Sequence, residues 1–126
     1  MSIMPPNKAH AIRALEPNAQ FTMVNDDITE WHSPDITQPT DSAINTKLTE
    51  LINAYPMDLL REERDKRIAT SDWRIVKAKE TSTNIPAAWK TYRQALRDLP
   101  ASSDPKLIDD TDLLDMSSVT WPTPPS

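Results

Sequence analysis

The segment DSAINTKLTELINAY, which runs from Asp41 to Tyr55, gives the clearest structural signal in the sequence. Its large apolar side chains recur every three or four residues, so they would share one face of a helix with 3.6 residues per turn. These side chains are Ile44, Leu48, Leu51, Ile52 and Tyr55. Thr40 directly precedes the segment, and its hydroxyl can cap the first turn. The pattern predicts a helix over residues 41–55.

Proline and charge shape the sequence after this helix. Pro56 is expected to break or kink the helix, because proline lacks the N–H that a helix interior needs and clashes with the preceding turn. A further, highly charged helix is predicted over residues 57–69, followed by a loop over residues 73–84. The charged helix has two oppositely charged pairs at i, i+4 spacing, Glu62–Lys66 and Glu63–Arg67.

The last clear helix is predicted over residues 86–98. Pro86 suits its first turn, and Pro100 ends it. Its apolar side consists of Ala88, Trp89, Tyr92, Ala95, Leu96 and Leu99. Because this stripe matches that of residues 41–55, we expect the two helices to pack together. The expected contact residues are Leu48, Leu51, Ile52, Tyr92 and Leu96.

The N-terminal region predicts a short helix and a β-hairpin. A narrow apolar face around Ile12 indicates a helix over residues 5–15. Residues 19–32 contain two short runs of strand formers with alternating polarity, separated by Asn25–Asp27. Asn and Asp tolerate the backbone conformations of tight turns, which matters in a chain without glycine. These residues therefore predict a hairpin.

Together these elements predict a small α+β fold, with an N-terminal β-hairpin followed by a mostly helical module and an extended Pro-rich C-terminal tail. We expect an N-terminal helix and hairpin segment over residues 1–38 and the helical module over residues 39–126. Apolar residues make up 37% of the chain, below the ~45–50% of ordinary globular domains. The core is therefore expected to be thin, and binding to a partner or to further copies of the chain would add stability.

The composition excludes several functional classes. The 126 residues include no glycine, which excludes glycine-dependent phosphate loops, and no cysteine, which excludes disulfides, zinc ribbons and iron–sulfur sites. The net charge of −5 disfavours a general nucleic-acid surface. No run approaches the ~18 apolar residues of a membrane helix, and residues 1–6 lack the features of a signal peptide. We expect no cofactor, no nucleic-acid or membrane partner, and a cytoplasm-like compartment.

The side chains that most resemble catalytic or metal-binding groups have simpler explanations. His32 lies beside Ser33 and close to Asp35, but members of a catalytic triad usually come from separate elements. The aspartates between Asp104 and Asp115 lack the central glycine and the twelfth-position glutamate of an EF-hand loop. We therefore predict neither a catalytic residue nor a metal site.

The sequence contains four tryptophans, a residue type that is enriched at protein interfaces. Trp89 and Tyr92 fall on the apolar side of the 86–98 helix and are expected in the core. The C-terminal tail is the better candidate for partner binding, because a Pro-rich segment loses little entropy when it docks. The partner-binding candidates are Trp121, Pro122, Pro124, Pro125 and, in the hairpin, Trp31.

An ordered series of motifs runs through residues 57–125. The motifs are Leu60-Arg61-x-x-Arg64-Asp65, Ser71-Asp72-Trp73, Trp89-x-x-Tyr92-Arg93-Gln94-Ala95-Leu96-Arg97-Asp98-Leu99-Pro100 and Val119-x-Trp121-Pro122-x-x-Pro125. In this order and spacing the chain resembles the phage tail assembly chaperone-like family, the tail fibre assembly and accessory proteins of tailed bacteriophages. The signature positions are Leu60, Arg64, Asp65, Asp72, Trp73, Trp89, Tyr92, Arg93, Leu96, Arg97, Asp98 and Pro100. The stretch after Trp73 and residues 101–118 are longer than in the family pattern.

The resemblance implies a non-enzymatic bacteriophage protein that binds another tail or tail-fibre protein as an assembly chaperone or accessory factor. It also implies a location in the host cytoplasm during assembly and in the virion tail. The alternative is a permanent structural virion component, such as a tail fibre tip, a tail adaptor or a decoration protein. Self-association into a homo-oligomer is a further expectation.

The charged signature residues suggest how two helices of the module would be joined. We expect Arg64 and Asp65 on one helix to pair with Arg93, Arg97 and Asp98 on the other. Paired guanidinium and carboxylate groups fix the register of packed helices more than they stabilise them. The same arrangement would place Trp73 and Trp89 at the ends of a thin two-helix core.

Overall fold

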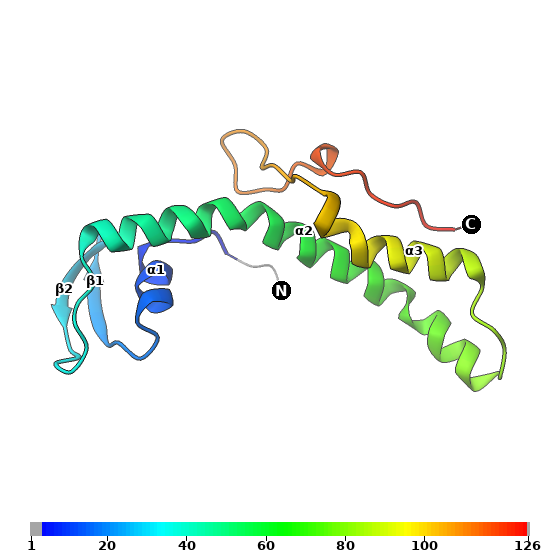
Figure 1. Cartoon of the computed structure of the whole chain (residues 1–126), viewed down its shortest axis with the longest axis horizontal. Helices are drawn as coiled ribbons and strands as arrows, with labels where there is room; N and C mark the ends of the chain where they lie inside the picture. Colours follow the sequence, from blue (N-terminus) through cyan, green and yellow to red (C-terminus); the bar gives the residue numbers. More distant parts are fainter. Residues whose placement is uncertain (1–3, 126) are drawn as a thin grey trace. The chain divides into compact units, whose positions relative to one another are not determined.

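The computed structural model describes residues 4–125, and these form an α+β fold with one hairpin and three α-helices (Figure 1). The elements are α1 (Lys8–Leu15), β1 (Phe21–Val24), β2 (Asp27–Trp31), α2 (Asp41–Glu80), α3 (Ala87–Asp98) and the short 3-10 helices η1 (Leu99–Ser102) and η2 (Met116–Ser118). The chain divides into two compact units, Met4–Tyr55 and a second unit that begins at Pro56. This division lies further along the chain than the boundary expected between residues 38 and 39.

α1 begins later than the sequence suggested, because a side chain sets its start. The Oδ1 atom of Asn7 accepts from the backbone N–H of His10 at 3.0 Å, and the Asn7 N–H donates to His10 Nδ1 at 3.2 Å. This reciprocal capping satisfies two backbone donors that a helix start leaves open. The helix therefore starts at Lys8 and not at the prolines of residues 5–6.

The hairpin forms where the alternating pattern predicted it, and two side chains make its turn possible. Asn25 and Asp26 have positive φ angles of 52° and 66°, the conformation of a two-residue turn that usually takes Asn-Gly. The paired residues are Phe21–Trp31, Thr22–Glu30, Met23–Ile28 and Val24–Asp27. Thr29 is an extra residue in β2, and this bulge brings Ile28 and Trp31, three positions apart, onto the same face of the hairpin.

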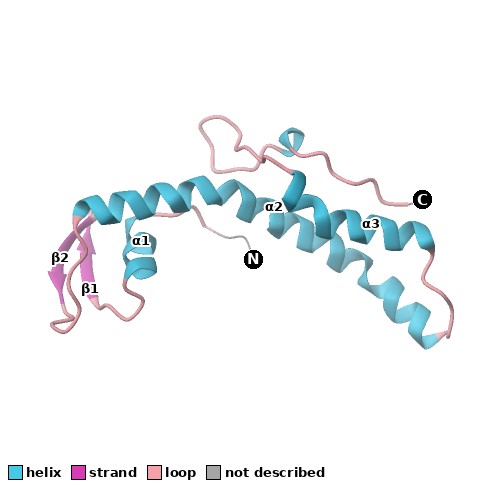
Figure 2. Ribbon diagram, viewed as in Figure 1, coloured by secondary structure: helices cyan, strands magenta, loops and turns pink. Residues whose placement is uncertain are grey.

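The core of the unit Met4–Tyr55 lies between α1, the hairpin and the first part of α2 (Figure 2). Ala11, Ile12 and Ile44 are its buried centre. The partly buried side chains around them are Leu15, Phe21, Met23, Ile28, Trp31, Leu48 and Leu51. Leu48 and Leu51, which were expected to contact residues 86–98, pack against this core within their own unit.

α2 is one helix of 40 residues, which corrects two predictions. Pro56 lies inside the helix and does not end it, because proline removes only its own N–H donor while the rest of the hydrogen-bond ladder continues. Residues 73–80 are helical and do not form the predicted loop. Ile75 and Val76 are β-branched, but β-branching lowers helix propensity only slightly and does not stop the helix.

The second half of α2 has the predicted charge pairs and a well-defined end. Lys66 pairs with Glu62 at 3.7 Å and Arg67 with Glu63 at 3.2 Å, so both i, i+4 ion pairs are confirmed. After the last turn, Ser82 adopts a φ of 54°. The backbone N–H groups of Thr83 and Ser82 then donate to the carbonyls of Ala78 at 2.9 Å and Lys79 at 3.4 Å. This is the hydrogen-bond pattern of a Schellman motif, which usually has glycine where this chain has Ser82.

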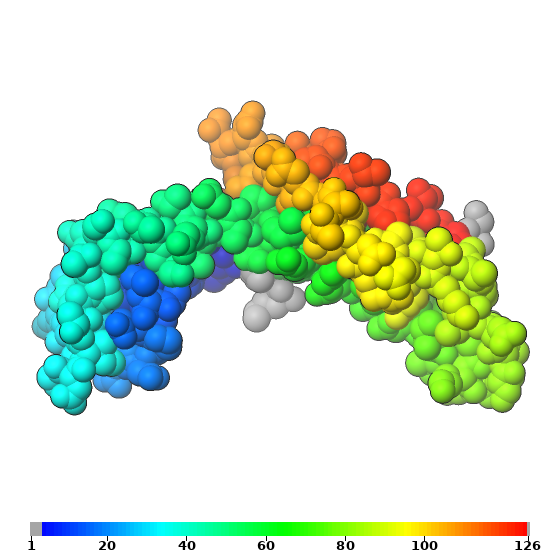
Figure 3. All heavy atoms as spheres, viewed as in Figure 1, coloured from blue at the N-terminus to red at the C-terminus, as the bar shows by residue number. Residues whose placement is uncertain are grey.

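In the second unit α3 returns beside the later part of α2. Residues 119–125, which we call the C-terminal segment, lie over both helices (Figures 1 and 3). Leu60, Leu99 and Val119 form a buried cluster with Met57, Leu114 and Trp121 around it. Leu96 is fully buried and Tyr92 nearly so, as the apolar stripe of α3 predicted. The core of this unit therefore contains residues from α2, from α3 and η1, and from the C-terminal segment.

The residues between η1 and the C-terminal segment are tied by backbone hydrogen bonds. Leu107 and Leu114 form an isolated antiparallel bridge, and the Ile108 N–H donates to the Leu113 carbonyl at 2.8 Å. Asp110 makes the turn between them with a φ of 61°. Within residues 4–125, no helix is long and apolar enough to cross a membrane.

Candidate partner-binding surface

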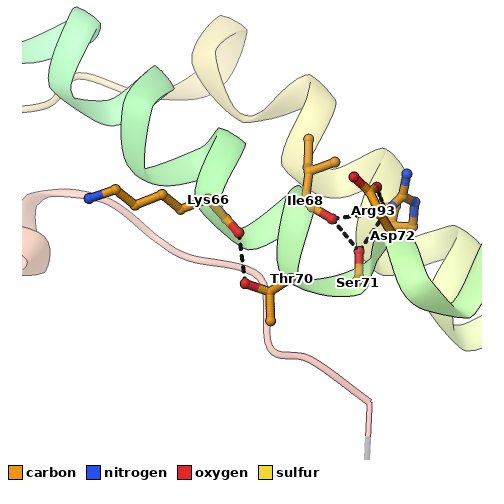
Figure 4. Close-up of polar contacts among 6 residues, drawn as sticks. All are labelled: Lys66, Ile68, Thr70, Ser71, Asp72 and Arg93. Atoms are coloured by element: carbon orange, nitrogen blue, oxygen red, sulfur yellow. Dashed lines mark hydrogen bonds and ion pairs between the residues drawn. The ribbon is translucent and has the colours of Figure 1, made fainter. Parts of the chain in front are cut away.

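Arg93 is the main polar link between α3 and α2 (Figure 4). Its Nη1 donates to the carbonyl of Ile68 at 3.0 Å, to Ser71 Oγ at 2.6 Å and to Asp72 Oδ1 at 2.9 Å. Ser71 is 3% exposed, and its hydroxyl also donates to the Ile68 carbonyl at 2.8 Å. Because the guanidinium binds two side chains and one backbone carbonyl of α2, it fixes how α3 is placed along α2.

The other charged signature residues do not cross between the helices. Arg64 pairs with its neighbour Asp65 at 2.9 Å, and Arg97 donates to Gln94 Oε1 at 2.9 Å. Gln94 in turn donates to Asp98 at 2.9 Å. Within residues 4–125 none of the expected pairs between the helices forms. Arg93 does reach α2, but its acidic partner there is Asp72. Asp72 lies about two turns after Arg64 on α2, beside Ser71, which also accepts a hydrogen bond from Arg93.

Aromatic and guanidinium groups alternate on one face of the second unit. The Cζ atom of Arg74 lies 3.9 Å from the centroid of the Trp89 ring and 4.4 Å from that of Trp73. Tyr92 meets the Trp89 ring edge-on, with the centroids 5.6 Å apart. Stacking of this kind stabilises by about 0.5–2 kcal/mol per contact, depending on how far water is excluded. We call Trp73, Arg74, Trp89 and Tyr92 the Trp–Arg cluster.

The cluster leaves a large apolar group open to solvent. Trp73 is 52% exposed, although it stacks on Arg74. The expectation that Trp73 and Trp89 close the ends of a two-helix core is therefore wrong. Both rings bind the same arginine, because residues 73–80 are helical and place Arg74 opposite Trp89. A half-exposed tryptophan held in a fixed position is typical of protein-binding surfaces.

A small pocket of about 190 Å³ opens beside the cluster. Its lining residues are Arg67, Thr70, Ser71, Trp73, Arg74, Trp89, Tyr92 and Pro124. Pro124 comes from the C-terminal segment, so that segment borders the pocket. Upstream of it, Trp121 contacts the Leu60–Leu99–Val119 cluster, and the Cζ atom of Arg67 lies 4.2 Å from the Trp121 ring centroid.

Trp31 belongs to the other unit and has its contacts within it. Its ring stacks on Phe21 with the centroids 6.0 Å apart. Its indole N–H donates to the carbonyls of Ser33 at 2.9 Å and Ile36 at 2.8 Å. These contacts give Trp31 a structural role, and its part in partner binding stays a prediction.

Arg67 and Arg74 are the functional candidates that the sequence reasoning missed. Both lie on α2. The sequence predicted a charged helix around Arg67 and a loop around Arg74. The sequence shows arginines and tryptophans in the same region, but it does not show which arginine contacts which ring. Arg67 meets Trp121 and Arg74 meets Trp89 only because the C-terminal segment and α3 fold back beside α2. Among residues 4–125, no group of three or more His, Cys, Asp or Glu side chains is placed to hold a metal ion.

Comparison with known proteins gives one match. A family model described as phage tail assembly chaperone protein matches residues 57–126, more than half of the 126-residue chain. The matched segment begins one residue after the start of the second compact unit and contains the whole Trp–Arg cluster. No curated protein and no solved structure matches the chain significantly.

Proposed function

The chain belongs to the phage tail assembly chaperone family, and from this membership we propose that it is a non-enzymatic bacteriophage protein that binds another tail or tail-fibre protein during tail assembly. The observation that carries the proposal is the position of the family match, residues 57–126, over the unit with the Trp–Arg cluster. The proposed site of action is the host cytoplasm, where tail proteins are assembled.

The contacts of the Trp–Arg cluster support a binding role. Trp73 offers apolar area that is already fixed in position, so little side-chain entropy is lost when a partner covers it. Arg74 has no ion pair within residues 4–125, and its guanidinium can still donate hydrogen bonds to a partner. Tryptophan and arginine are the residue types that most often dominate the binding energy of protein interfaces.

The partner-binding candidates of the C-terminal tail are divided between two roles in this proposal. Trp121 contacts the core of its own chain, so we assign it to anchoring the segment. Pro122, Pro124 and Pro125 follow this anchor and are proposed to take part in the contact with the partner, since Pro124 lies beside Trp73 and Trp89 at the pocket.

The test is co-expression of the tagged chain with the tail-fibre protein encoded in the same phage genome. We expect the two proteins to co-purify and to co-elute from a sizing column. A major coat protein of the same phage serves as the control and should not co-purify. If no tail protein is retained by the correctly folded chain, the proposal is wrong.

Mass spectrometry of purified virions separates a transient factor from a permanent component. Presence in infected cells with only trace amounts in mature particles would identify a factor that leaves the protein it binds. A stoichiometric amount in the virion would instead assign the chain to the tail structure.

A further inference from the structure

Within residues 122–125, the two prolines that are three positions apart are less exposed than the two residues between them. Pro122 and Pro125 are half-buried, whereas Thr123 and Pro124 between them are exposed. Three residues per turn is the period of the polyproline II helix, so prolines three positions apart point to the same side. The surface of the second unit therefore already accommodates a segment of the Pro-x-x-Pro type, supplied by its own chain.

The pocket beside this segment has the lining that proline-rich segments bind. Trp73, Trp89 and Tyr92 contribute three aromatic rings from two helices to a space of about 190 Å³. Aromatic-lined grooves recognise Pro-x-x-Pro segments in several unrelated domains, because flat rings stack on pyrrolidine rings and the extended backbone loses little entropy. Arg74 stacks between two of these rings and provides guanidinium donors for the carbonyls of such a segment.

The chain's own segment is held there weakly. Residues 122–125 make no hydrogen bond or ion pair with any other part of residues 4–125, so their contacts are apolar only. The anchor before them is also incomplete, because the buried indole N–H of Trp121 has no acceptor among the described residues. A buried donor without a partner costs about 1–3 kcal/mol. A segment held in this way can be exchanged for a similar one.

We propose that the pocket of Trp73, Trp89 and Tyr92 is a binding site for a Pro-x-x-Pro segment of the client protein, which takes the place of residues 122–125. In the free chain this segment borders the pocket through Pro124, while Trp73 stays 52% exposed and open to the client. This proposal depends on the proposed function only for the identity of the client, which is the tail protein that the chain binds. The chemistry of the ligand follows from the aromatic lining and from the proline segment already beside it.

The probe is a fluorescently labelled peptide with the sequence of residues 121–125, Trp-Pro-Thr-Pro-Pro. Its matched control is Trp-Ala-Thr-Pro-Ala, which keeps the central proline and removes the two that are three positions apart. We expect the full-length chain to bind the first peptide at least tenfold more tightly in fluorescence anisotropy. No binding of either peptide, or equal binding of both, would overturn the proposal.

Two changes in the protein test the place of binding. Trp73→Ala should weaken peptide binding at least fivefold, and because Trp73 is 52% exposed the fold should survive. Val76→Ala is the matched control, since Val76 is 55% exposed one turn away on α2 but does not line the pocket, and binding should stay within twofold. An unchanged affinity in Trp73→Ala, with a normal circular dichroism spectrum, would place the peptide elsewhere.

Deletion of residues 122–126 tests the exchange. The peptide should bind several-fold more tightly to the shortened chain, because no internal segment competes for the pocket. Weaker binding would mean that the segment is part of the site and contradicts the exchange. The proposed function fails separately: if the tail-fibre protein co-purifies equally well with Trp73→Ala, the function stands and the pocket proposal falls.

Discussion

At the scale of single residues, the chain makes its left-handed turns without glycine. Asn25, Asp26, Ser82 and Asp110 have φ angles between 52° and 66°. Asn and Asp reach this region more easily than other residues, because their short polar side chains form local hydrogen bonds. The shorter Ser82 side chain forms such local hydrogen bonds less readily, and Ser82 lies at the position after a helix end where glycine is most common. The end of α2 therefore carries a local strain.

Ser82→Gly is expected to stabilise the chain by about 0.5–1.5 kcal/mol, because glycine adopts a positive φ without the steric penalty of a Cβ atom. The measurement is the free energy of unfolding in denaturant. Asn84→Gly is the matched control: it lies two residues away with an ordinary φ, so the added freedom of the unfolded chain should give no gain. Equal stability of Ser82→Gly and the natural chain would contradict the expected strain.

At the scale of elements, Pro56 sits inside α2 and leaves the carbonyl of Ile52 without its helical donor. We expect Pro56→Ala to raise the free energy of unfolding by about 1–2 kcal/mol, since an interior proline is disfavoured by ~3 kcal/mol and part of this is offset by its rigidity in the unfolded chain. The change is followed by circular dichroism in denaturant.

The control for Pro56 is Pro86→Ala. Pro86 occupies the cap position before α3, where the missing N–H has no helical acceptor, so alanine should give no stabilisation. A loss of stability in Pro56→Ala, or the same small effect in both variants, would show that Pro56 does not destabilise α2.

The elements that the sequence predicted are those with a strong local pattern. Asn25–Asp26 between two alternating runs predicted the hairpin, and the apolar stripe around Tyr92 and Leu96 predicted α3. The loop assigned to residues 73–84 was wrong because Ile75–Val76 resembles a strand and Asp72 resembles a helix end. Neither signal is strong enough to stop a helix that contacts α3 through Arg93.

The candidate site shows a similar limit. The sequence marked Trp73 and Trp89 as signature residues and Trp121 as a partner-binding candidate, but it could not show that Trp73 and Trp89 stack on the same guanidinium. That contact joins residues 73, 74 and 89, and it exists only when α2 continues past Asp72 and α3 returns beside it. Contacts between distant segments follow from tertiary packing, which periodicity along one element does not report.

At the scale of the whole molecule, the C-terminal segment completes the core of the second unit. Val119 is 6% exposed and contacts Leu60 and Leu99. Deletion of residues 119–126 should therefore lower the free energy of unfolding by about 2–4 kcal/mol, since it removes one buried and one partly buried apolar side chain. The matched control is deletion of residues 122–126, which keeps Val119 and Trp121 and should leave the denaturant midpoint nearly unchanged. Equal effects of the two deletions would mean that Trp121 does not anchor the segment.

The distribution of the indole side chains gives the molecule built-in optical reporters. Trp31 lies in the unit Met4–Tyr55, whereas Trp73, Trp89 and Trp121 lie in the other unit, each within 4.4 Å of an arginine Cζ atom. Intrinsic fluorescence of the natural chain therefore combines one emission from the hairpin with three from guanidinium-stacked rings. Replacing Trp31 with phenylalanine, which keeps an aromatic ring opposite Phe21, would leave an emission spectrum that reports on the client-binding unit alone.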